Sequence, residues 1–84
     1  MNKESFLEVV RQQYSEEIHE AYVEHSHGGG SKIDIPGLNK RLLKLMANAK
    51  VDGLSAHEFE ELARATLPEE VAHVVDFSAV KKAA

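Results

Sequence analysis

The sequence predicts a small all-α domain of four helices, with a long first helix, a glycine-rich linker and a tight corner between two later helices. Three observations predict this class. Apolar side chains recur with helical spacing from residue 3 to residue 25, and again after residue 35. Three consecutive glycines, Gly28 to Gly30, separate these two stretches. A helical run that ends at Asp52 and Gly53 is followed at once by a new helix start at Ser55.

The length of 84 residues predicts one domain, with a long helix at 1–25, a glycine-rich linker at 26–34 and a compact helical part at 35–80. A chain this short buries only about 60 % or a little more of its unfolded surface. It contains no cysteine, so self-association is the expected way to enlarge its core. We find no secretory signal and no bilayer-spanning apolar run, and therefore expect a cytoplasmic protein without a membrane partner.

The first helix is predicted from Lys3 to His25. One face carries the apolar side chains Phe6, Leu7, Val10, Tyr14, Ile18, Ala21 and Tyr22. Such a helix is roughly 30 Å long, and the later helices are too short to cover the whole stripe. We therefore expect a second copy of the same helix to cover it. The predicted contact residues are Phe6, Val10, Tyr14, Ile18 and Tyr22.

The second helix is predicted to begin near Pro36, with either Asp34 or Asn39 as its capping residue. Its apolar face consists of Leu38, Leu42, Leu45, Met46 and Ala49, and its polar side of Lys40, Arg41 and Lys44. The third helix follows Ser55, which forms a capping box with Glu58. A fourth helix should open near Glu69, with an apolar side of Val71, Val74 and Val75 that Phe77 and Val80 would extend.

Charge alternates along the chain. Residues 1–24 carry a net charge of -4, residues 31–50 carry +4 and residues 52–76 carry -6, within a total of -4. Either the basic segment is neutralised by the acidic ones within the fold, or Lys40, Arg41 and Lys44 orient an acidic partner. The acidic total argues mildly against nucleic acid and anionic membranes.

The corner at Ala49, Gly53 and Ser55 resembles the helix-turn-helix motif, which places an alanine, a glycine and a small polar residue at these positions. Leu54 and Phe59 would then fill its packing positions. The resemblance implies a DNA-reading third helix, yet the outward residues of that helix are His57, Glu60, Glu61 and Arg64. The carboxylates of Glu60 and Glu61 on this face would repel the phosphates of DNA, so nucleic acid is not the favoured partner.

No cofactor and no catalytic site is predicted. The glycine run follows a helix and lacks the lysine of a phosphate-binding loop, and no serine has a nucleophile-elbow context. His25 and His27 are explained by the helix C-terminus that they follow, although two such pairs in a dimer could bind zinc.

The sequence therefore favours a non-enzymatic protein-interaction or regulatory module that forms a homodimer through its first helix. The alternative is a helix-turn-helix regulator that uses the Ala49 to Leu62 corner, with Lys40, Arg41 and Lys44 on phosphates. Both hypotheses use the same basic side chains and differ in the partner that these would meet.

Overall fold

A computed structural model describes residues 2–26 and 32–83 of the chain. Within these ranges it contains five helices and no strand, which confirms the all-α class. The helices are α1 Lys3–His25, α2 Ile35–Val51, α3 Ala56–Thr66, α4 Glu69–Val74 and α5 Phe77–Ala83. His27 and the glycine run Gly28 to Gly30 lie outside the described residues.

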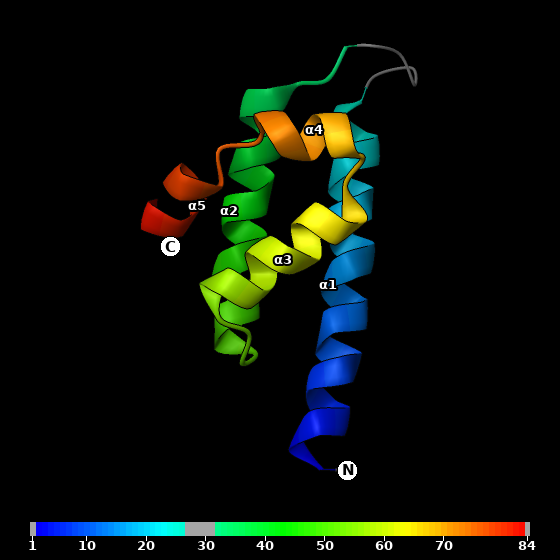
Figure 1. The fold of residues 1–84 in the computed structure, drawn as a ribbon, viewed down its shortest axis with the longest axis vertical. Coiled ribbons are helices and arrows are strands. Elements are labelled where there is room, and N and C mark those ends of the chain that lie inside the picture. Colours follow the sequence, from blue (N-terminus) through cyan, green and yellow to red (C-terminus); the bar gives the residue numbers. More distant parts are fainter. Residues whose placement is uncertain (1, 27–31, 84) are drawn as a thin grey trace.

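The two long helices α1 and α2 run antiparallel and side by side (Figure 1). α3 crosses one side of this pair obliquely and contacts both helices. α4 continues from α3 toward the end of the pair where α2 begins, and α5 folds back beside α2. The N-terminal turns of α1 extend past the turn between α2 and α3 (Figure 1). Among the described residues, no helix is both long enough and apolar enough to cross a bilayer.

One continuous core joins all five helices. Its buried apolar side chains come from every element, which is what a short chain needs to form a single core. They are Val10, Tyr14, Ile18, Ala21, Leu38, Leu42, Leu45, Met46, Ala49, Leu54, Phe59, Ala63, Leu67, Val71, Ala72, Val75, Phe77 and Val80.

The helix starts follow from local capping chemistry. The Asp34 carboxylate accepts a 3.0 Å hydrogen bond from the Gly37 N–H, so Asp34 caps α2 and Asn39 lies inside the helix. Ser55 and Glu58 form the predicted capping box, in which each side chain accepts a hydrogen bond from the other residue's N–H. These bonds satisfy N–H groups that have no partner within their own helix.

The predicted fourth helix is two short helices, α4 and α5. The chain leaves the helical conformation after Val74, and the Asp76 carboxylate caps α5 by accepting a 3.0 Å hydrogen bond from the Ala79 N–H. The break turns the chain so that Phe77 and Val80 are buried against the core. Val74, predicted to face inward, is 55 % exposed, because the change of direction removes it from the buried side.

Glu60 links α3 to α5 through two cations. Its carboxylate lies 2.7 Å from the Lys81 ammonium and 2.9 Å from the Arg64 guanidinium. The Arg64 guanidinium carbon also lies 4.6 Å from the centre of the Phe77 ring, in a cation–π contact. The hydrogen bond from Lys81, with that from Arg64, lowers the pKa of the Glu60 carboxyl although its burial acts in the opposite direction.

This lowered pKa makes the stability of the α3–α5 contact depend on pH. The carboxylate contributes fully above its unfolded pKa of 4.5, and the contribution is lost as the pH falls through the lower folded value. Glu60→Gln should therefore lower the free energy of unfolding by about 0.5 to 1 kcal/mol at neutral pH and by less near about pH 3. Urea unfolding followed by circular dichroism at both pH values measures this.

The matched control for that measurement is Glu61→Gln. The Glu61 carboxylate pairs with His57 at 2.9 Å, but both side chains are exposed, so its replacement should change stability little. An equal loss for Glu60→Gln at both pH values would contradict the assignment of the effect to the ionised carboxylate.

Gly37 occupies the place where the ends of α1 and α2 approach each other. A Cβ atom at this position would lie only 2.2 Å from the Asp34 Oδ2 and 2.8 Å from the His25 Cδ2. The main chain is also joined here, because the Asp34 N–H donates a 2.9 Å hydrogen bond to the His25 carbonyl oxygen. Any side chain at position 37 must therefore displace the cap or the imidazole.

Gly37→Ala is expected to lower the free energy of unfolding by about 1 to 3 kcal/mol, since it places a methyl group in occupied space. Thermal or urea unfolding measures the loss. Asp34→Ala combined with Gly37→Ala should lose less than the sum of the single changes, because the first removes one of the clashing groups. Strict additivity of the two changes would contradict the clash.

Candidate functional site

The middle of the predicted contact stripe lies in the core of the chain itself. Val10, Tyr14 and Ile18 are buried by α2 and α3, so the expectation that the later helices leave this part of the stripe uncovered is wrong. The sequence shows that these residues share one face but does not show which elements of the same chain cover it. Contact of these three side chains with a partner would require the helices to separate.

Tyr14 is a structural residue that joins α1 to the end of α2. Its hydroxyl donates a 2.5 Å hydrogen bond to the Asp52 carboxylate, which lies on the exposed turn after α2. Burial of the ring raises the pKa of the Tyr14 hydroxyl well above its ordinary value, and the Asp52 carboxylate raises it further.

Tyr14→Phe should lower the free energy of unfolding by about 1 to 2 kcal/mol at neutral pH, because it deletes a hydrogen bond to a charged group. A raised folded pKa contributes stability fully below the unfolded value of 10.0, and this contribution is lost as the pH rises above it. Between about pH 9 and pH 11, the free energy of unfolding should therefore fall less for Tyr14→Phe than for the parent protein.

Denaturant unfolding across that pH range measures the difference. Tyr22→Phe is the control, since the described residues provide no hydrogen bond to the Tyr22 hydroxyl. Parallel alkaline losses in the parent and Tyr14→Phe would contradict the role of the Tyr14 hydroxyl.

The two ends of the predicted stripe reach the surface. Phe6, near the N-terminal end of α1, is 48 % exposed. Tyr22 is half-buried, with its ring centre 6.4 Å from that of His19. The neighbouring Val9, which lies outside the predicted stripe, is 55 % exposed. The exposed apolar side chains of α1 thus include Phe6 and Val9, near its N-terminal end.

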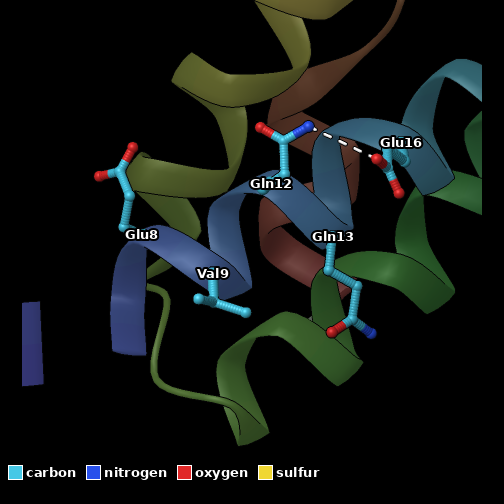
Figure 2. A pocket seen from close by; sticks show the side chains of 5 residues that line it. All are labelled: Glu8, Val9, Gln12, Gln13 and Glu16. Carbon is cyan, nitrogen blue, oxygen red and sulfur yellow. Dashed lines mark hydrogen bonds between the residues drawn. The ribbon is translucent and has the colours of Figure 1, made fainter. Parts of the chain in front are cut away.

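The outer face of α1 forms a shallow depression that faces solvent. Figure 2 shows its lining side chains, which all come from this one helix: Glu8, Val9, Gln12, Gln13 and Glu16. The Gln12 amide donates a 3.4 Å hydrogen bond to the Glu16 carboxylate. A depression with walls from one helix cannot surround a small molecule, but its mixture of carboxylates, amides and a valine suits contact with another helix.

The basic strip of α2, which consists of Lys40, Arg41 and Lys44, is not neutralised within the fold. No described acidic side chain forms an ion pair with any of the three. Lys40 and Lys44 are exposed, whereas Arg41 is half-buried with its Nε lacking a hydrogen-bond partner among the described residues. The expectation that the basic and acidic segments neutralise each other is therefore wrong for this strip.

The acidic third helix obtains its cations from elsewhere. The Arg11 guanidinium of α1 lies 2.9 Å from the Glu58 carboxylate, and Lys81 of α5 reaches Glu60. The hydrogen bonds from Ser55 and from Arg11 lower the pKa of the Glu58 carboxyl. The described ion pairs of these acids are thus made with residues of α1, α3 and α5, and Lys40 and Lys44 of α2 remain exposed.

The helix-turn-helix-like corner has the packing that the sequence predicts. Ala49, Leu54 and Phe59 are buried, and Gly53 has a φ of 107°, a left-handed conformation that favours glycine. On its outer side, however, His57 pairs with Glu61, and Arg64 is bound to Glu60. The two basic side chains on the outer side of α3 are thus both engaged with carboxylates of the same helix.

Of His25 and His27, the pair considered for a metal site, only His25 lies within the described residues. The His25 Nδ1 lies 2.8 Å from the Ala21 carbonyl oxygen, which is the helix-terminal contact expected for this position. Among the described residues, no group of three or more histidines, aspartates or glutamates is placed to hold a metal ion.

No protein-family model, curated protein or solved structure matches this chain. The candidate surfaces are therefore defined by the geometry of this chain: the outer face of α1 and the basic strip of α2. Of the predicted basic strip, Lys40 and Lys44 are exposed and Arg41 is half-buried. The sequence did not identify Val9 or Glu16, because they lie on the polar side of α1 and have no distinctive motif.

Proposed function

We propose that this protein is a non-enzymatic interaction module that self-associates through the outer face of its first helix. The observation that supports the proposal is the exposure of Phe6 and Val9, at 48 % and 55 %, on the outer side of the first turns of α1, whose inner side packs against the core through Leu7 and Val10. Large apolar side chains gain free energy when they leave water, by about 1.5 to 3 kcal/mol for each one fully buried. A helix from a second copy offers them such burial.

The polar groups beside these residues also suit a protein partner. The carboxylates and amides around Val9 can form hydrogen bonds and ion pairs at the edge of a helix-on-helix contact. Specificity would then come from charge, and burial of the apolar side chains would provide most of the affinity.

The hydroxyl groups of the described residues support a non-enzymatic role. Ser15 pairs with the Thr66 hydroxyl at 3.1 Å, the Ser26 hydroxyl donates to the Val23 carbonyl oxygen, and Ser55 caps α3. In the described ranges, no serine hydroxyl forms a hydrogen bond with an imidazole, which is the arrangement that activates a serine nucleophile.

Val9→Glu is expected to weaken self-association at least about tenfold, because it places a charge at the centre of the proposed contact. Sedimentation equilibrium over a wide concentration range measures the change. Val74→Glu is the matched control, since Val74 is a valine with the same exposure of 55 % on α4. Both variants should keep their helical circular dichroism because neither side chain is in the core.

A parent protein that stays monomeric at every concentration would contradict the proposal. Equal weakening by Val9→Glu and Val74→Glu would also contradict it, because the effect would then not depend on α1.

A further inference from the structure

Two exposed stripes with identical spacing run along the outer sides of α1 and α2. Each stripe has four residues at intervals of four, three and four positions, which keep side chains in a narrow row on a helix. The α1 stripe, read from its C-terminal end, is Glu20, Glu16, Gln13 and Val9. The α2 stripe, read from its N-terminal end, is Lys40, Lys44, Ala47 and Val51. All eight residues are exposed.

The two stripes complement each other when they are placed antiparallel. The pairs that then face each other are Glu20 with Lys40, Glu16 with Lys44, Gln13 with Ala47 and Val9 with Val51. Val51 is 86 % exposed, the highest value among the exposed large apolar residues of the described chain. None of the four charged residues takes part in an ion pair within the described ranges. No ion pair within the described ranges therefore makes use of this complementarity.

Both stripes lie away from the helices that cover the α1–α2 pair. α3 packs on the side of α1 that carries Arg11 and Ser15, which contact Glu58 and Thr66. The α1 stripe lies on the solvent side of that helix, and the α2 stripe lies opposite the buried face of α2. Figure 1 shows α3 across one side of the pair, which leaves the other side uncovered by the described helices.

We propose that a second copy of this chain docks on this uncovered side, so that the α1 stripe of each copy packs against the α2 stripe of the other. The inference rests on the proposed self-association and names the surface of the second copy that meets α1. Because the same two stripes are used twice, a two-fold axis parallel to the helices closes the assembly as a dimer.

The positions of the two helices along the proposed two-fold axis permit this symmetry. Rotation about an axis parallel to the helices keeps every residue at its own height, and it places α1 of one copy antiparallel to α2 of the other. Within one chain, His25 lies beside Asp34, and Tyr14 bonds to Asp52. Counted from the His25–Asp34 contact, Glu20 and Lys40 lie five and six residues along their antiparallel helices, so they are level to within about one helical turn, which extended side chains can span.

The dimer should be sensitive to salt. Exposed ion pairs are weak and are screened by salt, whereas the burial of Val9 and Val51 is not. Higher ionic strength should therefore weaken the association without abolishing it.

The test exchanges the charges of the two stripes. One variant carries Glu16→Lys with Glu20→Lys, and the other carries Lys40→Glu with Lys44→Glu. Each variant alone would place like charges opposite each other and is expected to be monomeric where the parent is dimeric. An equimolar mixture should form a heterodimer, because the basic α1 of the first then meets the acidic α2 of the second while the reciprocal pair keeps its parent charges.

Sedimentation velocity from about 10 µM to about 1 mM at low salt measures the mass of each sample. The control is Glu69→Lys with Glu70→Lys, which makes the same change in net charge as the Glu16 and Glu20 variant but on α4, and should leave the dimer intact. Circular dichroism confirms that each variant is folded.

The outcomes separate this inference from the proposed function. A parent that dimerises while the mixture of charge variants stays monomeric would overturn the pairing of α1 with α2 and leave self-association through α1 in place. Loss of the dimer in the α4 control as well would also overturn it, because net charge would then be the cause. A parent that is monomeric throughout would overturn the proposed self-association itself.

Discussion

The close antiparallel packing of α1 against α2 is the constraint on which the rest of the structure depends. It is fixed near both ends by polar contacts: the Tyr14 hydroxyl donates to Asp52, and the Asp34 N–H donates to the His25 carbonyl oxygen. Gly37 permits the approach at the second end because it has no side chain. The three short helices have too little apolar surface to fold alone, and they become stable by packing on this pair.

The charges of the third helix are neutralised by elements that flank it, and this determines which cations remain outside. Arg11 reaches Glu58 from α1, and Lys81 reaches Glu60 from α5. With these carboxylates occupied, the basic strip of α2 forms no ion pair with a described residue, and its Lys40 and Lys44 are exposed. A chain with a net charge of -4 thus keeps a cationic row on one helix beside an acidic row on its antiparallel neighbour.

This arrangement changes which surface of α1 is available to a partner. The apolar side chains with the strongest helical periodicity, such as Tyr14 and Ile18, are used in the core of the chain. The accessible surface of α1 is instead its polar side, where the exposed Val9 lies among carboxylates and amides. Such a surface favours recognition by complementary charge, which Lys40 and Lys44 of a second copy would supply in the proposed dimer.

The sequence alone predicts the helix class, the bounds of α1 and the capping box at Ser55, because helical periodicity and capping depend on residues within about four positions of each other. For α2 it leaves Asp34 and Asn39 as alternative caps, and the structure shows Asp34. The sequence also placed Lys40 and Lys44 together on one face. The tertiary structure decided which faces are buried, where the chain breaks before α5, and which cation meets which carboxylate. Arg11 and Glu58 are 47 positions apart, and no local pattern relates residues at that separation. Their contact exists only because α3 packs across α1, and long-range packing of this kind determines which side chains remain free for a partner.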